Sequence, residues 1–325
     1  MKNARIFLAM AAMIVASVAA SQAPDAPHQP SRPELVILDT DIGDDIDDAF
    51  ALALALRSPE MKILGIGTAF GEAELRARLV DRFLEAIGRA DIPVGVGVWS
   101  PHNNVFTQAA YAEHGPELWH PEAVDVLLKQ ISAHPGQITL IAIGPLNNIR
   151  AAIERDPATF RKLKRVVIMG GSIYRGYDGR DGARRPPDAE WNVSRDPAGL
   201  RALLASGVPV FMMPLDSTQI HLETPEREMI FSHGSPLTDQ LTLLYHQWMA
   251  GSEGHSPTPT LFDPVAVAYA IRPELCPVTP LRIEVDAKGF TRPVDGPPNA
   301  QVCLQSDEKG FREFMLDRIT EKAER

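Results

Sequence analysis

The chain has 325 residues, of which 45% are hydrophobic, and it carries a formal net charge of −10 at pH 7. An acidic protein with scattered Lys and Arg is a poor candidate for binding nucleic acid, because phosphates require a basic surface. No basic amphipathic stretch indicates binding to a membrane surface. The length is sufficient for one large α/β domain.

The N-terminus has the pattern of an export signal. Lys2 and Arg5 precede an apolar run over residues 6–20, and polar, proline-rich sequence follows. We therefore predict a secretory signal peptide over residues 1–23, cleaved after Ala20 or Ala23, and a flexible linker over residues 24–33. An uncleaved membrane anchor is the alternative, but a bilayer span needs roughly 20 apolar residues. We expect a secreted, periplasmic protein with its catalytic domain at residues 34–325 and no membrane association after cleavage.

Apolar runs that end at turn residues alternate with segments of helical period over most of the chain. Strands are predicted at residues 35–41, 62–69, 93–98, 137–143, 165–169 and 208–213, and helices at 47–57, 74–88, 121–133, 147–155 and 196–206. This alternation predicts an α/β fold with a mainly parallel, doubly wound, Rossmann-like sheet and helices on both faces, in a single domain.

The rhythm changes after residue 214. Helices are predicted at residues 236–250 and 263–271, strands at 281–285 and 301–304, and a last helix from Gly310. Two long polar segments, residues 99–120 and 172–191, interrupt the pattern, and loops of this length in a compact domain are usually functional or disordered. Cys276 and Cys303 are the two cysteines. An oxidising compartment would permit them to pair, but the sequence leaves the pairing open.

Six aspartates lie between residues 39 and 48. Asp39 and Asp41 are two residues apart on a strand, so they point to the same side at its carboxyl end, where parallel sheets bind ligands. Gly43 then permits a tight turn, and Asp47 and Asp48 stand in the first turn of a helix. Such crowded carboxylates raise one another's pKa unless a cation lies among them. Because every ligand is an oxygen, the pattern predicts a hard ion, and Ca²⁺ suits flexible carboxylates better than Mg²⁺ does.

Three other interpretations of the cluster were considered. A helix N-cap with solvated acids needs only one such residue. An EF-hand requires alternating acids closed by a distal Glu, and this segment lacks that arrangement. A phosphatase of the haloacid dehalogenase type also has two aspartates two apart at a strand end, but Thr or Val should then stand where this chain has Gly43.

The motifs resemble those of the inosine-uridine-preferring nucleoside hydrolase family. Residues 39–43 (DTDIG) and 47–49 (DDA) match its N-terminal DTD-x-G and DDA, with two more residues between them than in the shortest family form. Asp44-Asp45 offers a competing doublet, but the helix that follows favours Asp47-Asp48. Three further segments match in order: residues 141–149 (IAIGPLNNI), residues 167–171 (VIMGG) with 188–197 (DAEWNVSRDP), and residues 262–269 (FDPVAVAY).

The resemblance implies an enzyme that uses a Ca²⁺-activated water to hydrolyse the N-glycosidic bond of purine and/or pyrimidine nucleosides to ribose and free base. It makes Asp41 the general base and a metal ligand, and it adds the metal ligands Asp48, Asp263 and the Ile143 carbonyl. The substrate-binding residues that it implies are Asp47, Glu190 (at the 5′-hydroxyl), Asn192, Asp263 and Glu72. Asp39 would orient the other carboxylates, and Asp45 has no assigned role. The expected partner is a small nucleoside, and we expect a homodimer or a homotetramer.

Two positions depart from the family pattern. Phe262 stands where some members have a His that helps the base to leave, and Glu72 stands where members often have Asn. Other candidates for the leaving-group acid are His102, Tyr111, His114, Tyr245, His246, Trp248 and His255, and the sequence selects none of them. A calcium-dependent nucleoside-binding protein without catalysis is therefore the alternative function, and the base preference is open.

Overall fold

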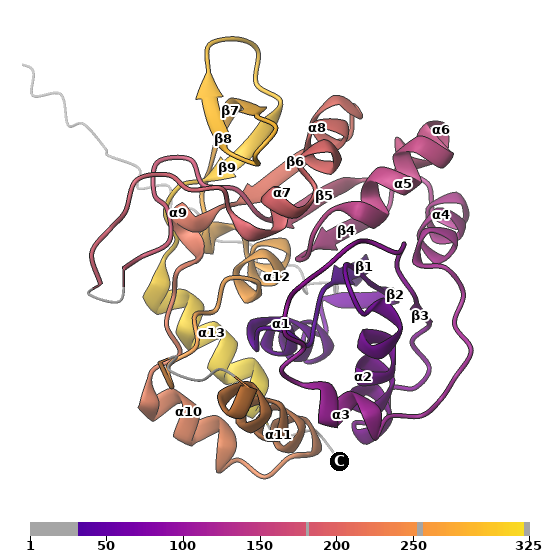
Figure 1. Ribbon diagram of the computed structural model, residues 1–325, viewed down its shortest axis with the longest axis vertical. Helices are drawn as coiled ribbons and strands as arrows, with labels where there is room; N and C mark the ends of the chain where they lie inside the picture. Colours follow the sequence, from indigo (N-terminus) through magenta and orange to yellow (C-terminus); the bar gives the residue numbers. More distant parts are fainter. Residues whose placement is uncertain (1–31, 180–181, 252–255, 322–325) are drawn as a thin grey trace, which may run out of the picture. The chain divides into compact units, whose positions relative to one another are not determined.

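The described residues of the computed structural model, 32–179, 182–251 and 256–321, contain one mixed sheet. Its strand order is β3-β2-β1-β4-β5-β6-β9-β7-β8 (Figure 1). The six N-terminal strands are parallel neighbours: β1 Glu34–Thr40, β2 Met61–Thr68, β3 Val94–Gly95, β4 Ile138–Ala142, β5 Arg165–Met169 and β6 Val210–Met213. The predicted mainly parallel α/β sheet is confirmed. The predicted signal peptide and all but the last two linker residues lie outside the described residues.

The C-terminal strands turn one edge of the sheet antiparallel. Strand β9 (Ala300–Cys303) lies parallel to β6, whereas β7 (Val278–Val285) runs antiparallel to both β9 and β8 (Thr291–Val294). The sequence pattern missed β8, because Pro293 interrupts its four residues, and proline in a sheet is confined to positions such as this edge strand. It also started β7 three residues late.

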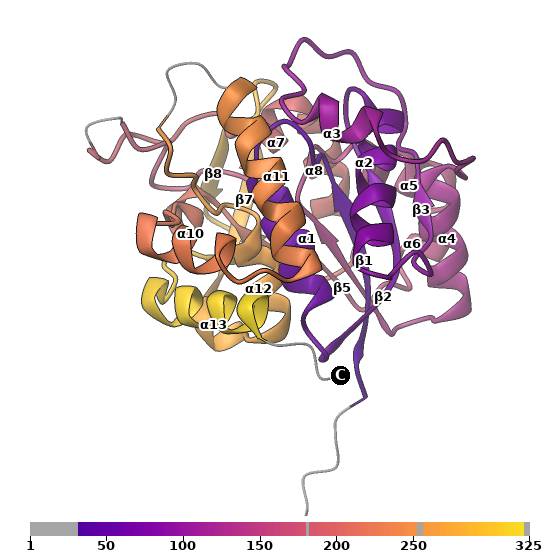
Figure 2. The same ribbon diagram turned by 90° about the horizontal axis from the view of Figure 1, so that it is seen from below.

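Helices cover both faces of the sheet (Figures 1 and 2). On β1, Val36 and Leu38 pack into one apolar cluster, while Ile37 packs into the other. The first layer contains α1 Asp47–Leu56, α2 Ala73–Ala86, α11 Pro236–Gly251, α12 Pro264–Ile271 and α13 Glu308–Thr320. The second contains α4 Ala123–Ala133, α5 Asn147–Arg155, α6 Pro157–Phe160 and α8 Pro197–Ala205. Both faces of the parallel strands are therefore buried, which accounts for their nearly continuous apolar sequence.

The predicted strand at residues 93–98 is too long. Pairing with β2 is confined to Val94–Gly95, since the next residues find other partners. Val96 forms an isolated bridge with Glu122, and the Val98 N–H donates to the Asn148 side chain at 2.9 Å. The Asn148 side chain thus takes the place of a β2 carbonyl as the acceptor for Val98, and a prediction from sequence period cannot detect this.

Short helices were also missed, because each is one or two turns long. They are α3 Ala109–Glu113, α6 Pro157–Phe160, α7 Trp191–Arg195, α9 Leu215–Thr218, α10 Thr224–Phe231 and the 3₁₀ helix η1 Pro273–Leu275. Asp196 separates α7 from α8, whose first residue is Pro197. Within the described ranges, no helix is both long and apolar enough to cross a membrane.

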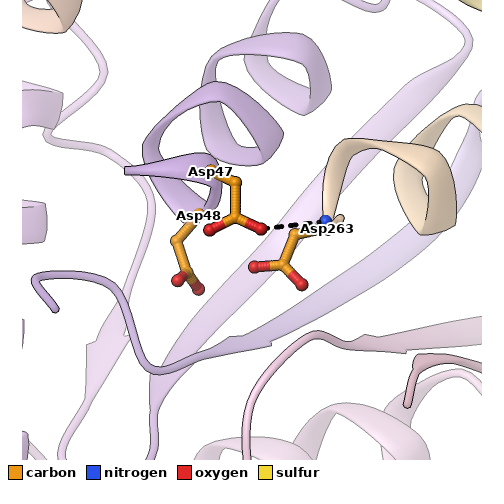
Figure 3. Close-up of side chains that lie close together, drawn as sticks. All are labelled: Asp47, Asp48 and Asp263. Carbon is orange, nitrogen blue, oxygen red and sulfur yellow. Dashed lines mark hydrogen bonds between the residues drawn. The ribbon is translucent and has the colours of Figure 1, made fainter. Parts of the chain in front are cut away.

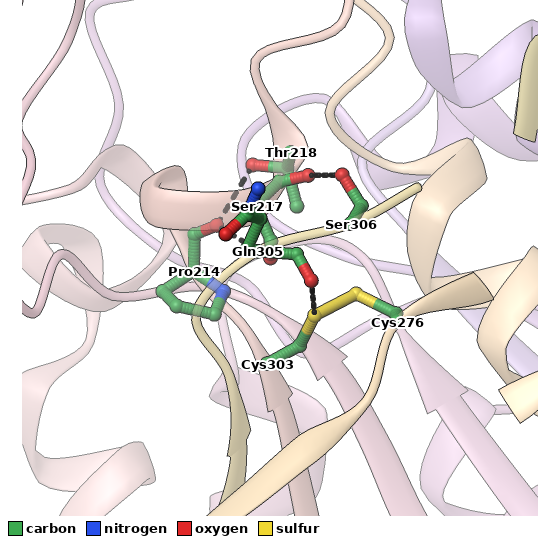
Figure 4. The surroundings of a disulfide bond; sticks show 7 residues. All are labelled: Pro214, Ser217, Thr218, Cys276, Cys303, Gln305 and Ser306. Carbon is green, nitrogen blue, oxygen red and sulfur yellow. Dashed lines mark hydrogen bonds between the residues drawn. A yellow bond between two sulfur atoms is a disulfide. The ribbon is translucent and has the colours of Figure 1, made fainter. Parts of the chain in front are cut away.

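Cys276 and Cys303 form a disulfide with their Cα atoms 5.6 Å apart (Figure 4). Cys276 directly follows η1 and Cys303 ends β9, so the bond joins the segment after α12 to the sheet. Nearby, the Ser306 hydroxyl donates to the Ser217 carbonyl at 2.7 Å and thereby links the chain beyond β9 to α9. The pairing that the sequence left open is present in the folded chain.

Candidate active site

Three carboxylates converge at the carboxyl edge of the sheet. Asp47 and Asp48 begin α1, and Asp263 immediately precedes α12 (Figure 3). Each offers a ligand oxygen within 4.8 Å of the others, and all three residues are buried. The Asp263 N–H donates to Asp47 at 3.2 Å, and the Thr40 hydroxyl donates to Asp48. Two helix starts that are more than 200 residues apart in sequence are thus held together.

Burial, reinforced by the neighbouring carboxylates, raises the pKa of Asp47, Asp48 and Asp263 well above its ordinary value. The Arg76 guanidinium opposes the rise in the pKa of Asp48 but does not offset it. A buried carboxylate stays ionised only when an opposite charge or hydrogen-bond donors compensate for the lost water. A group of oxygen ligands that needs positive charge fits a hard divalent cation. The donor set is therefore suited to a metal ion.

Asp41 lies beside this cluster at the end of β1. Burial raises its pKa to about 7, although the guanidinium of Arg76 opposes the shift. Its side chain has little room, because a Cβ at Gly144 would lie 2.8 Å from Asp41 Oδ1. Glycine at residue 144 therefore allows the β4–α5 turn to pass close to the Asp41 carboxylate.

Arg76 holds the backbone that carries Asp41. This fully buried side chain donates from Nε to the Phe70 carbonyl at 2.9 Å, and from Nη1 to the carbonyls of Asp41 and Ile42. Its Nη2 forms an ion pair with Asp44 at 2.8 Å. The Arg76 side chain of α2 thus holds the turn from residue 41 to residue 44 in place.

Glu190 and Asn192 form another wall of the site. Glu190 caps α7 by accepting from the N–H groups of Asn192 (2.8 Å) and Val193 (3.0 Å), and it also accepts from Gly171 at 3.0 Å. Burial still raises its pKa to about 6, against the effect of these three donors. The Asn192 amide donates to the Ile143 carbonyl at 3.1 Å. The Ile143 oxygen thus faces the same site as the acids.

These groups surround one cavity of about 480 Å³. This volume is in the range of small-molecule sites. Its acidic lining comprises Asp41, Asp44, Asp45, Asp47, Asp48, Glu190 and Asp263, and Ile143 and Asn192 join them. The cavity therefore brings together every predicted site residue except Glu72.

Glu72 lies outside the lining of the cavity. Its side chain is 56% exposed, and its carboxylate is 3.0 Å from His102 Nε2. In this conformation Glu72 contacts the 99–120 segment. The cavity lining therefore gives no support to the predicted contact between Glu72 and the substrate, which stays a prediction.

Sequence reasoning missed most of the aromatic and loop residues that line the cavity. These are Asn104, Val105 and Thr107 from one long polar segment, Tyr177 from the other, and Trp191 in α7. The length of the two segments was the available signal. Among the candidate leaving-group acids in the described part of the chain, only Trp248 lines the cavity. Phe262, which cannot act as an acid, lines it too. The hydroxyls of Tyr111 and Tyr245 donate elsewhere, to Gln240 and Pro257, and His255 is outside the described residues.

A buried carboxylate centre at the carboxyl edge of a doubly wound sheet, opening on a cavity of this size, defines a metal-dependent α/β enzyme that acts on a small molecule. The family described as inosine-uridine preferring nucleoside hydrolase matches residues 36–313. The chain belongs to this family.

Individual relatives agree with this assignment. The chain is 31% identical to the pyrimidine-specific ribonucleoside hydrolase RihA of Citrobacter koseri, over 87% of this chain and 97% of that protein. It is 30% identical to the RihA of Shigella boydii with the same coverage. Among solved structures, a plant nucleoside hydrolase gives a TM-score of 0.77 at 26% identity, over 89% of this chain and all of that one. A purine-preferring ribonucleoside hydrolase from Gardnerella vaginalis gives 0.73 at 25% identity, over 88% and 98%.

The chain is thus a nucleoside hydrolase, an enzyme that cleaves the N-glycosidic bond of nucleosides. The predicted family, enzyme class and nucleoside substrate are confirmed, and this favours an enzyme over the non-catalytic binding protein. Metal dependence agrees with the family and with the acidic cluster.

Proposed function

We propose that this chain is a Ca²⁺-dependent ribonucleoside hydrolase that releases ribose and free base from purine and/or pyrimidine nucleosides. The observation that carries the proposal is the buried Asp47, Asp48 and Asp263 cluster, which needs a cation and lies in the same cavity as Asp41. The protein ligands would be Asp41, Asp48, Asp263 and the Ile143 carbonyl. The bound ion would lower the pKa of a water and orient it toward the sugar.

The residues of the chain would then divide the work of hydrolysis. Asp41, whose carboxylate lies where a side chain at residue 144 would stand, would take the proton of the attacking water. The sugar acquires positive charge as the bond to the base breaks, and the ring of carboxylates stabilises that charge. A carbonyl oxygen has two lone pairs, so Ile143 can accept from Asn192 and still serve as a ligand.

The remaining roles concern recognition of the sugar. Asp47 and Asn192 would bind the ribose hydroxyl groups, and Asp263 would contact both metal and ribose. Glu190 would accept from the 5′-hydroxyl. Its position is fixed for this role, because three backbone N–H groups hold its carboxylate.

The base preference stays open between the two classes, because one relative is named pyrimidine-specific and a structural neighbour purine-preferring. We further propose export to the periplasm. The N-terminal pattern of residues 1–23 supports it, as does the Cys276–Cys303 disulfide, since such bonds persist in oxidising compartments. A homodimer or homotetramer stays a prediction.

A substrate and metal panel tests the proposal. The purified protein is stripped with a chelator and incubated with uridine or inosine in the presence of Ca²⁺, Mg²⁺ or no metal, and reducing sugar is measured. We expect release of ribose that depends on Ca²⁺ and exceeds the rate with Mg²⁺. Equal rates with and without metal would contradict metal dependence, and no release from any purine or pyrimidine riboside would contradict the ribonucleoside activity.

A further inference from the structure

Cleavage of a neutral nucleoside places the electron pair of the broken bond on the departing base. That base must be met by a hydrogen-bond donor, because developing negative charge is stabilised by donors aimed at it. The cavity is rich in carboxylates, which repel such charge. A donor is therefore needed on the side of the cavity that faces the base.

Most polar donors around the cavity already have acceptors within the protein. The Thr107 hydroxyl donates to the Asp44 carbonyl at 2.7 Å, and the Asn104 amide donates to the Asp44 carboxylate. The Asn192 amide donates to the carbonyls of Ile143 and Met169. Thr107 and Asn192 are thus occupied in positioning the walls, whereas Asn104 uses one of its two amide N–H groups for this.

Tyr177 is differently placed. Its hydroxyl oxygen accepts from the backbone N–H of Trp191 at 2.9 Å, so the oxygen is fixed while its own hydrogen remains to be donated. Among the described residues, its hydroxyl makes no donated hydrogen bond to protein. Burial, together with the nearby Glu190 carboxylate, raises the pKa of Tyr177 above its ordinary value, so the phenol keeps this hydrogen at neutral pH.

The Tyr177 ring packs against Phe262, which directly precedes Asp263. The ring centroids are 6.0 Å apart, and the planes meet at 81°, an edge-to-face contact. Both rings line the cavity. A phenol with a donatable hydrogen therefore stands beside an apolar ring that can donate nothing.

We propose that Tyr177 is the catalytic residue that donates a hydrogen bond to the departing base, an inference that rests on the proposed function. The bond between the sugar carbon and the base nitrogen breaks, and both electrons go to the base. The Tyr177 O–H stabilises the resulting charge, and the base then takes a proton from solvent. Water forms the new bond to the sugar carbon and gives one proton to Asp41, which returns it to solvent, so atoms and charge balance.

Two indoles are the competing donors on the walls. The Trp191 ring is covered by the Arg195 guanidinium, which lies 3.8 Å from the ring centroid. Trp248 is buried on the other wall. An indole N–H is a donor only, and Trp248→Phe removes it, so this variant belongs in the same test.

The experiment compares substrates that differ in their need for a donor. Wild type and Tyr177→Phe are assayed with Ca²⁺ on uridine, inosine and 4-nitrophenyl β-D-ribofuranoside, whose nitrophenolate leaves readily as an anion. We expect Tyr177→Phe to lower kcat/KM about 10²- to 10³-fold for the nucleosides and less than threefold for the nitrophenyl riboside. Tyr174→Phe is the matched control, because Tyr174 is on the same segment but is exposed and outside this cavity.

Each other outcome overturns the assignment. An equal loss on all substrates would indicate a role in the sugar site or in structure, and no loss would remove Tyr177 from the reaction. If the loss on uridine disappears with 5′-deoxyuridine, the partner of Tyr177 is the 5′-hydroxyl. A selective loss in Trp248→Phe instead of Tyr177→Phe would transfer the role to Trp248.

Separate controls test whether the variants fold and whether the proposed function holds. Circular dichroism and Ca²⁺-dependent thermal unfolding monitor the folding of Tyr177→Phe. Tyr177→Leu, which also lacks a donor, is the second variant and must show the same selective loss. If wild type cleaves no riboside, the proposed function fails. If wild type cleaves all three substrates and the variants keep the wild-type ratio of kcat/KM between the nucleosides and the nitrophenyl riboside, only the role of Tyr177 fails.

Discussion

Replacing Arg76 with methionine should lower the free energy of unfolding far more than replacing an exposed arginine. Methionine fills the space with a flexible apolar side chain but withdraws the donors from the Phe70, Asp41 and Ile42 carbonyls. It also removes the partner of Asp44. Breaking a buried ion pair by removing one member costs about 3–5 kcal/mol, because the other charge is left uncompensated.

The structure favours the lower part of that range. The Asp44 side chain is 17% exposed, so water can partly solvate its charge once Arg76 is gone. We therefore expect a loss of about 3 kcal/mol in the free energy of unfolding, and a fall of roughly 6 °C or more in Tm. Turnover should fall as well, because the Asp41 carbonyl is one of the groups released.

Urea denaturation followed by circular dichroism measures the effect. The matched control is Arg89→Met, since the Arg89–Asp91 pair is 38% and 69% exposed and should contribute less than about 1 kcal/mol. The double variant Arg76→Met with Asp44→Asn should recover part of the loss by removing the unpaired charge. If Arg76→Met were no more destabilising than Arg89→Met, the proposed support of the Asp41 turn would be wrong.

Three further predictions concern the general base Asp41, the binding of Ca²⁺ and the disulfide. Asp41→Asn should abolish turnover, measured as reducing sugar, while circular dichroism remains native; near-normal activity would refute its role as base. In metal-free protein, burial raises the pKa of Asp39 and Asp41 to about 7, so the native chain binds more protons than the unfolded chain between about pH 4 and 7. Their contribution to stability should therefore decline as pH rises through this window, and Ca²⁺ should raise Tm more at pH 8 than at pH 5; an equal increase would contradict the reasoning. The double variant Cys276→Ser with Cys303→Ser should lose about 2–4 kcal/mol of unfolding free energy while KM is unchanged, and an unchanged urea midpoint would show that the bond does not support the fold.

Local patterns were sufficient to predict the framework of the site. The strand period places Asp41 at the carboxyl end of β1, and the helix that follows places Asp47 and Asp48 in its first turn. Asp263 precedes α12, as its segment indicated. Such positions follow from sequence because strand and helix periods are local properties of the chain.

The contacts between distant segments needed the folded chain. The Arg76–Asp44 pair joins a helix to a turn 32 residues away, and both residues read in isolation as ordinary surface charges. The sequence likewise did not indicate that the Glu72 side chain contacts His102 and lies outside the cavity lining. Residue type gives the chemistry that is available, but the direction of each side chain depends on what packs around it.

The sequence by itself determined the α/β framework, the family and an oxygen-rich cluster suited to a hard cation. Only the tertiary structure decided that Tyr177, Trp191 and Trp248 line the same cavity, that Cys276 and Cys303 meet, and that a buried arginine supports the Asp41 turn. The physical reason is that residue type and local period do not say which distant segments meet, even for core residues such as Trp248, Cys276 and Cys303. Their positions depend on long-range packing and on single hydrogen bonds, which leave no period in the sequence.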